Sequence, residues 1–374
     1  MTADMMIAIA APHAMAEAQT FIVAHAERLP GCREALCGSE LERTRAGGRS
    51  GPHPLARRAA AFLSRASGRP VDRALVGWTL RRFLRRHRFR VVLAEFGPTG
   101  VLLAGPCRRT GIPLVVHFHG YDAYRQDVLT SCGAEYRRMF RTCAAVVAVS
   151  GPMAEQLRSL GAPGEKVHVN PCGVDCDMFR PTDPAANPPV FAAVGRLVEK
   201  KAPHLTLLAF RKVLDACPEA RLQMIGEGPL MAVCRDMVGA LGMEGAVALQ
   251  GTRPHADVAA AMRGARAFVQ HSVRAGDGDC EGSPVAVAEA GAAGLPAVAT
   301  RHAGIPETVL DGVTGLLVEE RDVDGMADRM IELARDPALA ARLGRAARER
   351  ICSEFSMGKR IGRLAAILED AATR

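Results

Sequence analysis

The sequence has few aromatic residues and no long apolar run. Phe, Trp and Tyr make up 4% of its 374 residues. No segment offers the roughly 18 uninterrupted apolar residues of a membrane span, which argues against a membrane-spanning protein. No G-x-G-x-x-G follows a predicted strand, which argues against a dehydrogenase that binds a dinucleotide. No Ser, His and Asp pattern predicts a nucleophilic triad either.

Cysteine is present, but without a pairing pattern. The eleven cysteines are an odd number scattered along the chain, which predicts no disulfide framework and suits a reducing cytosol. Cys172 and Cys176 lack a second pair at zinc-site spacing, so we interpret them as structural. The first residues mimic a secretion signal, but Asp4 and Pro12 interrupt that pattern. We therefore expect a first β-strand there and a cytoplasmic protein.

The formal net charge of +8 favours an anionic partner such as a nucleotide, a phosphosugar or a membrane surface. Arginine is densest in WTLRRFLRRHRFR, residues 78–90. This segment is either a solvated helix face or a helix on the anionic inner face of the plasma membrane, which would make the protein peripheral. Because no nucleic-acid-binding module accompanies the charge, we expect no nucleic-acid partner.

Runs rich in Val, Ile and Ala alternate with helical stretches, a pattern typical of parallel βαβ units and an α/β fold. The predicted strands are 5–11, 90–96, 113–118, 144–149, 190–195, 220–226, 246–251, 265–270 and 295–300. The predicted helices include 20–29, 71–88 and 152–161. The segment 171–189 is rich in Pro and Asp and predicts a linker between two doubly wound halves. Ligands of such halves bind at the carboxyl ends of the strands.

Two cations follow the first predicted strand of the second half. In GRLVEKKAPH (195–204), Arg196 and Lys201 lie in a loop that leads into a helix. Cations beside the N–H groups at the start of a helix form an anion site.

A second loop and helix carry two carboxylates within EGSPVAVAEA (281–290). We expect Glu281 in the loop, Gly282, Ser283 and Pro284 at the helix start, and Glu289 about two turns further on. The backbone N–H groups of 282–285 are then available to an oxygen-rich ligand, and the carboxylates are available to vicinal hydroxyls. The alternative is that both glutamates simply face solvent.

Several ordered motifs resemble one family. VGRLVEKK, EGSPVAVAEA and GLPAVATRHAGIPETVLDGVTGLLV look like the C-terminal half of retaining family 4 glycosyltransferases with the GT-B fold. The FVQHSVRAGDGDCEGSP pattern resembles members that build bacterial exopolysaccharides of the colanic-acid type. The resemblance implies an N-terminal acceptor-side domain (1–182), a donor-binding domain (190–354), and a final helix (355–374) packing towards the N-terminal domain. The resemblance further implies that both domains are Rossmann-like parallel sheets that face a central cleft.

The resemblance also implies a role for each matching residue. Arg196 and Lys201 would hold the donor diphosphate, and Glu289 would bind the ribose. Glu281, with the backbone of Gly282, Ser283, Pro284 and Val285, would hold the sugar hydroxyls. His119 in HGYD would contact the donor sugar, while Thr20 and Asp122 would lie on the acceptor side. The donor would be a UDP- or GDP-sugar, and no cofactor or metal ion would be needed. The acceptor would be a polysaccharide or a lipid-linked saccharide.

The chain departs from the family pattern at several points. APHAMAEAQTF (11–21) replaces the usual Gly-rich loop after the first strand. Ala202 replaces the glycine after the lysine, so we expect no positive φ there. His117 and His119 are expected on opposite faces of one strand, with His117 structural.

Two acidic pairs and one further loop complete the motifs of the second half. Asp277 with Asp279, and Asp175 with Asp177, are interpreted as turns in preference to metal ligands. GTRPHADV (251–258) is the candidate segment for selecting the nucleotide base.

Two alternatives stay open on the sequence alone. The chain is either a glycosyltransferase or another GT-B sugar enzyme, such as a phosphorylase or an epimerase. The altered first loop and the basic segment 78–90 also fit a non-catalytic GT-B scaffold protein.

Overall fold

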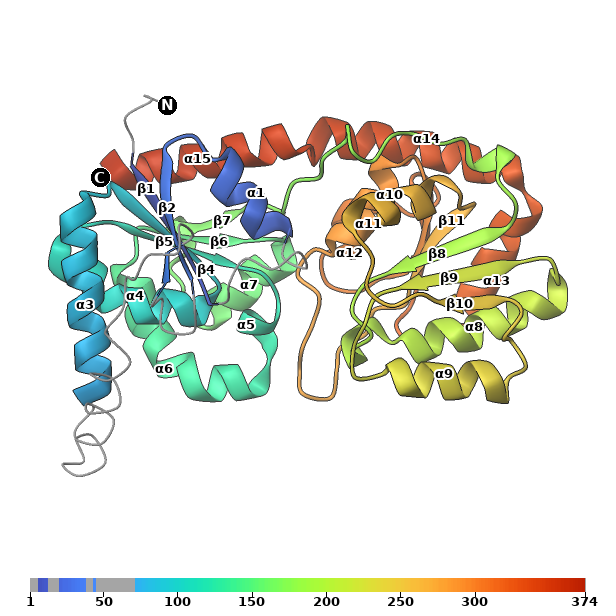
Figure 1. Ribbon diagram of the computed structural model, residues 1–374, viewed down its shortest axis with the longest axis horizontal. Coiled ribbons are helices and arrows are strands. Elements are labelled where there is room, and N and C mark those ends of the chain that lie inside the picture. Colours follow the sequence, from blue (N-terminus) through green and yellow to red (C-terminus); the bar gives the residue numbers. More distant parts are fainter. Residues whose placement is uncertain (1–5, 13–19, 38–42, 45–70, 374) are drawn as a thin grey trace. The chain divides into compact units, whose positions relative to one another are not determined.

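The computed structural model describes residues 6–12, 20–37, 43–44 and 71–373. It divides into two compact units. Unit 1 comprises the chain up to Asn170 together with Arg360–Arg374, and unit 2 comprises Pro171–Lys359 (Figure 1). Among the helices of the described ranges, none is long and apolar enough to cross a membrane.

Unit 1 is built on a seven-stranded sheet with the order β3-β2-β1-β4-β5-β6-β7. All neighbouring strands are parallel except β2 and β3, which are antiparallel. The strands are β1 Ile7–Ala11, β2 Cys32–Cys37, β3 Arg43–Thr44, β4 Val91–Glu95, β5 Leu114–Phe118, β6 Ala145–Ala148 and β7 Val167–Val169. The helices are α1 Thr20–Arg28, α3 Val71–His87, α4 Gly97–Thr110, α5 Tyr121–Tyr124, α6 Gln126–Thr142 and α7 Gly151–Ser159, with the 3₁₀ helix η2 at Gly164–Lys166.

Unit 2 is built on a six-stranded, fully parallel sheet with the order β10-β9-β8-β11-β12-β13. The strands are β8 Val190–Val194, β9 Arg221–Ile225, β10 Val247–Leu249, β11 Ala267–Gln270, β12 Ala297–Thr300 and β13 Gly315–Val318. The helices are α8 Pro203–Ala216, α9 Met231–Ala240, α10 His255–Arg263, α11 Val285–Ala292, α12 Ile305–Thr308, α13 Val323–Arg335 and α14 Pro337–Glu354. The last helix, α15 Met357–Thr373, starts in unit 2 and belongs to unit 1 from Arg360 onward. Two 3₁₀ helices, η3 Pro184–Ala186 and η4 Glu199–Lys201, complete the chain.

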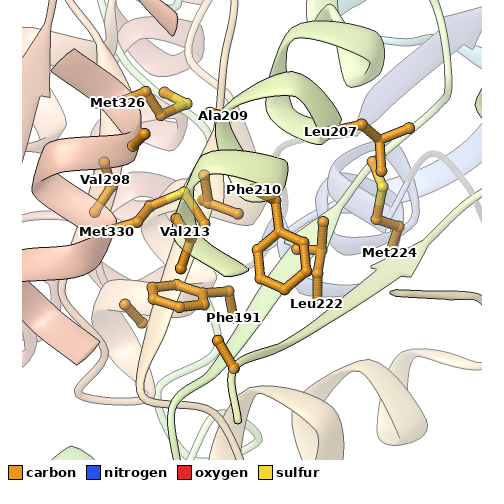
Figure 2. Packing of buried hydrophobic residues seen from close by; sticks show 14 of the residues in the cluster. Phe191, Leu207, Ala209, Phe210, Val213, Leu222, Met224, Val298, Met326 and Met330 are labelled. Carbon is orange, nitrogen blue, oxygen red and sulfur yellow. The ribbon is translucent and has the colours of Figure 1, made fainter. Parts of the chain in front are cut away.

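Both faces of the second sheet are covered, so its strands are apolar on both sides. Phe191 of β8 faces α8 and α13, where its ring packs edge-on against Phe210 at 6.3 Å between centroids. Figure 2 shows these rings with Met326 and Met330 of α13. The next residue of β8, Ala192, belongs to the apolar cluster on the opposite face. This alternation holds the strand ends, and the loops that follow them, in fixed positions.

All nine predicted strands are confirmed within two residues at each end, and the three predicted helices are present. The sequence did not predict β2, β3, β7 and β13. β3, β7 and β13 lie at sheet edges. β2 lies inside its sheet, but its sequence CREALC carries Arg33 and Glu34 and so has no continuous apolar run.

The predicted linker 171–189 packs against unit 2. Phe179 is 1% exposed within the core of that unit, and the Thr182 N–H donates to the Ala293 carbonyl at 2.9 Å. Cys176 in this segment forms a disulfide with Cys352 of α14. The sequence did not predict that pair, because cysteines with a separation of 176 residues carry no spacing signal.

The residues that follow strands β8 and β9, Gly195 and Gly226, approach so closely that only glycine fits at position 226. A Cβ on Gly226 would lie 1.9 Å from the Gly195 carbonyl oxygen. We expect Gly226→Ala to lower the free energy of unfolding by about 2 kcal/mol in urea titrations, because the backbone must shift. Gly362→Ala in α15, where nothing lies within 4 Å, is the control and should stabilise by about 0.5 kcal/mol. Equal stability of the two variants would contradict this close approach.

Candidate functional site

The site in unit 2 lies where the strand order reverses, between β8 and β11. At such a point the loops after two neighbouring strands diverge and leave room for a ligand. Arg196 and Lys201 lie in the loop after β8, and Glu281 lies in the loop after β11. Arg196 is exposed, while Lys201 is half-buried.

The residue after Lys201 departs from expectation. Ala202 has φ 36° and ψ 54°, a left-handed conformation, so the prediction that this turn needs no positive φ is wrong. The chain must turn here from η4 into α8, and the fully buried Ala202 accepts the strain that a glycine would avoid.

Lys201 and Glu281 form an ion pair. The ammonium Nζ lies 2.8 Å from Glu281 Oε1 and 3.3 Å from the side-chain oxygen of Gln270, the last residue of β11. The Glu281 residue is 6% exposed, and Oε1 has no well-aligned hydrogen-bond donor among the described residues. Burial raises the pKa of Glu281, but the charges of Lys201 and Lys200 outweigh it and lower the pKa to about 2. The carboxylate is therefore charged and held by electrostatic attraction.

All three residues of η4 hold the loop that carries Glu281. Glu199 accepts the Gly276 N–H at 2.7 Å. Lys200 is buried, and its ammonium donates to Asp279 at 3.0 Å and to the Cys280 carbonyl at 3.1 Å. Lys200 is the first lysine of VEKK, and the sequence did not predict it as a site residue.

The backbone of Glu281 is fixed from the other side by a buried histidine. His302 Nε2 accepts the Glu281 N–H at 3.1 Å, and Nδ1 pairs with Glu320 Oε1 at 2.6 Å. Because Nε2 accepts, Nδ1 carries the proton that is donated to Glu320. His302 and Glu320 are also residues that the sequence did not indicate, since they follow other strands.

Helix α11 begins at Val285, with Pro284 at the N-cap. Pro284 therefore lies just before the first turn of α11. The sequence predicted it within that turn, one position further along the helix. No side chain caps this helix. Its first N–H groups thus make no capping bond to the N-cap side chain, which is the condition for an anion or hydroxyl site at a helix start.

Glu289 lies within α11 and is 7% exposed, so it does not simply face solvent. Its Oε1 accepts from His255 Nε2 at 2.7 Å, and the His255 ring packs edge-on against Phe179. The hydrogen bond that His255 donates to this carboxylate raises the pKa of His255 above its ordinary value. His255 belongs to GTRPHADV, the segment expected to select the nucleotide base. The structure thus places this segment in contact with Glu289, the residue expected to bind the ribose.

Both D-x-D pairs form turns, as predicted. Asp277 accepts the Asp279 N–H at 2.9 Å, and Asp175 accepts the Asp177 N–H at 3.1 Å. Asp279 is in addition the partner of Lys200.

In unit 1, His119 follows β5 and lies beside a buried carboxylate. His119 Nε2 is 2.6 Å from Glu95 Oε2, His25 Nδ1 is 2.7 Å from Glu95 Oε1, and His117 Nδ1 is 3.6 Å from Oε2. The rings of His117 and His119 are 4.2 Å apart between centroids. The expectation that they face opposite sides is wrong, because residues two apart on a strand share a face.

The acceptor-side candidates differ in their surroundings. Asp122 is fully buried, and its carboxylate accepts the N–H groups of Gly97, His119 and Gly120 at 2.9 to 3.0 Å. Burial raises the pKa of Asp122, while His119 and these amides act in the opposite direction. The carboxylate thus orients the loops after β4 and β5. Thr20 is the half-buried first residue of α1.

Among the described residues, one group of side chains has atoms close enough to surround a metal ion: His25, Glu95 and His117, within 4.8 Å. The two shortest contacts of Glu95, 2.6 and 2.7 Å, are hydrogen-bond distances to imidazole nitrogens. Ligands around a tetrahedral zinc ion lie farther apart, at about 3.3 Å. The geometry therefore fits protons between these groups better than a metal ion.

Two family models cover most of the chain. Residues 38–178 match "Glycosyltransferase Family 4", and residues 177–350 match "Glycosyl transferases group 1". The putative colanic acid biosynthesis glycosyltransferase WcaL of Escherichia coli is 34% identical over 288 residues, covering 75% of this chain and 71% of that protein. The chain belongs to the family 4 glycosyltransferases.

Other relatives of this glycosyltransferase differ in what their names specify. The GDP-mannose-dependent alpha-(1-6)-phosphatidylinositol monomannoside mannosyltransferase of Mycolicibacterium smegmatis is 31% identical, covering 77% of this chain and 78% of that protein. The crystal structure of Anabaena HepE in complex with UDP has a TM-score of 0.76 at 18% identity, covering 98% of this chain and all of that chain. The GT-B fold expected from the sequence is confirmed.

The glycosyltransferase should lose the Glu281 contribution to stability in acid. The pKa of about 2 lies below the unfolded value, so the contribution is present above pH ~4.3 and is lost as the pH falls towards 2. We expect Glu281→Gln to cost about 3 kcal/mol at pH 7 in urea unfolding, with the difference narrowing below pH ~4. The exposed Glu155→Gln is the control and should change little at either pH. A difference that stays constant with pH would contradict the pairing.

The pair between His255 and Glu289 predicts the opposite pH dependence. A raised pKa in the folded state stabilises below the unfolded value of about 6.5, and the effect is lost as the pH rises through the folded value. The loss of stability in His255→Gln should therefore be larger near pH ~6 than near pH ~8.5. His204, whose pKa is lowered by burial and by Arg321, is the matched control, and the native contribution of its side chain should grow with pH. If the loss of stability changed with pH in the same direction for His255→Gln and His204→Gln, the pairing of His255 with Glu289 would be refuted.

Proposed function

We propose that this glycosyltransferase transfers a hexose from a UDP- or GDP-sugar to a saccharide or lipid-linked saccharide during exopolysaccharide synthesis. Two relatives that exceed 30% identity, WcaL of Escherichia coli and AmsK of Erwinia amylovora, are named for colanic acid and amylovoran biosynthesis. The mannosyltransferase relative is named for GDP-mannose and a phosphatidylinositol acceptor. The name of the mannosyltransferase supports a nucleotide-sugar donor. Because the names of WcaL and AmsK specify no nucleotide, the proposal includes both UDP- and GDP-sugars.

The ion pair between Lys201 and Glu281 is the observation that carries the proposal. An ammonium has three donor hydrogens, so Lys201 can keep its carboxylate partner and still bind a phosphate oxygen. Arg196 in the same loop adds a second cation for the departing diphosphate. Charge that develops on the leaving group is thus met by fixed donors, and no metal ion is required.

The sugar and the nucleoside meet different groups in this proposal. Glu281 and the N–H groups that begin α11 accept and donate hydrogen bonds to the sugar hydroxyls. Glu289 binds the ribose diol, and His255 keeps its carboxylate oriented. His119 is proposed to contact the sugar as well, while Thr20 and the loop held by Asp122 are proposed to receive the acceptor. The anomeric configuration is retained, with the leaving phosphate helping to deprotonate the incoming hydroxyl.

Nucleotide titration and a transfer assay test this proposal. Lys201→Ala should weaken UDP or GDP binding by at least tenfold, about 1.4 kcal/mol, because it removes a charge-assisted contact. Lys212→Ala is the matched control, since that lysine is exposed on α8 and pairs with Asp324. Glu281→Gln should abolish sugar transfer, and transfer by the native enzyme should survive a chelator. Equal nucleotide affinity of both lysine variants would overturn the donor site.

The basic segment 78–90 adds a membrane contact to the proposal. In α3, Leu80 and Leu84 are fully buried and the helix packs against α4. The outer face carries Trp78, which is 51% exposed, and exposed arginines that include Arg82 and Arg85. An exposed indole beside arginines matches an anionic lipid surface, on which a cytoplasmic enzyme would reach a lipid-linked acceptor.

Vesicle sedimentation tests the membrane contact. The enzyme should bind vesicles that contain phosphatidylglycerol and should not bind pure phosphatidylcholine vesicles. Replacing both Arg82 and Arg85 with Gln should reduce binding by about 30-fold, from about 1 kcal/mol for each arginine. Replacing the exposed Arg137 and Arg138 of α6 with Gln is the control for overall charge. Equal losses in the two double variants would show that α3 has no special role.

A further inference from the structure

Glu95 is a fully buried carboxylate at the end of β4, and no motif of the sequence predicted it. Its exposed fraction is 0%, and three imidazoles surround it: His25 from α1, and His117 and His119 from the β5 region. A buried carboxylate costs several kcal/mol unless it is paired and hydrogen-bonded. This cluster therefore needs an explanation beyond packing.

The chemistry of the donors assigns the protons. An ionised carboxylate only accepts hydrogen bonds, so His25 donates through Nδ1 and His119 donates through Nε2. Burial raises the pKa of Glu95, but His25 and His119 outweigh it and hold the pKa well below the usual range. Burial also lowers the pKa of His117, whose ring nitrogens have no aligned hydrogen-bond partner among the described residues. His117 is thus the neutral member of the cluster.

The His119 ring is also confined by packing. Its centroid lies 4.4 Å from that of Phe21 and 4.8 Å from that of Phe96. Phe96 has φ 70° and ψ 143°, a conformation that is strained for any residue except glycine. Its N–H is held by the His117 carbonyl at 2.8 Å. Strain retained directly after Glu95 indicates that the exact position of this strand end matters.

We propose that Glu95, itself held by His25, is a positioning residue that fixes the orientation of His119 and keeps the proton on its Nε2. The inference rests on the proposed contact between His119 and the donor sugar. A fixed ring with one tautomer presents the same edge to the sugar in every catalytic cycle, which a freely rotating ring does not.

The groups that face His119 come from four elements. They are His25 of α1, Glu95 of β4, His117 of β5 and Asp122 of α5. Glu95 accepts a hydrogen bond from the His119 ring, whereas Asp122 accepts from the His119 backbone. Removing the charge of Glu95 should therefore change the ring more than any other single substitution in the cluster.

The experiment compares the native enzyme with Glu95→Gln. Long-range ¹⁵N–¹H spectra of the free protein, assigned with His119→Gln, report the tautomer of His119. We expect Nε2–H in the native protein and a loss of that single tautomer in Glu95→Gln. In transfer assays kcat should fall about tenfold or more and its pH profile should move, while KM for the donor stays unchanged.

The controls separate positioning from general damage. Glu155→Gln, on the surface of the same unit, should leave the spectra and kcat as in the native enzyme. His25→Ala removes the hydrogen bond that holds Glu95 Oε1 and should weaken the preference of His119 for the Nε2–H tautomer, by less than Glu95→Gln does. This variant decides the matter if Glu95→Gln does not fold. An unchanged tautomer and pH profile in both variants would overturn the inference. If the native protein transferred no sugar, the proposed function would fail, but the spectra of the free protein would still decide the role of Glu95.

Discussion

The contact between two loops at the switch point of the second sheet is the constraint on which the donor site depends. Glu199, Lys200 and Lys201 are consecutive, and each holds a different part of the segment 276–281. The same short helix therefore carries the cation that we propose for the diphosphate and fixes the loop that carries the carboxylate that we propose for the sugar. A ligand meets a site whose charges are already in place, so little reorganisation is needed.

The supporting residues come from strands that lie far apart in the sequence. Gln270 ends β11, His302 follows β12, and Glu320 follows β13. Because all three strands are parallel, their carboxyl ends meet at one edge of the sheet. Glu320 pairs with His302, His302 accepts the Glu281 N–H, and Gln270 contacts the Lys201 ammonium. These connected contacts lower the free-energy cost of burying the Glu281 charge.

Unit 1 uses a different solution to hold its histidine. Glu95 is buried among imidazoles instead of ammonium groups, and the strand end beside it is strained at Phe96. Asp122 supports the same region by accepting three backbone N–H groups from the loops after β4 and β5. A rigid scaffold with charged groups at its loop ends suits chemistry that depends on positioning more than on a covalent intermediate.

The sequence by itself determined the α/β alternation, the strands of both sheets except β2, β3, β7 and β13, and the motif residues Arg196, Lys201, Glu281 and Glu289. Local apolar patterns and loop composition carry that information, because they act over a few residues. Only the tertiary structure decided the rest: the partners Glu95, Lys200, His255 and His302, the left-handed Ala202, and the disulfide of Cys176 with Cys352. These features depend on which strand ends lie side by side. No local pattern encodes that order, since it is fixed by the packing of helices against both faces of each sheet.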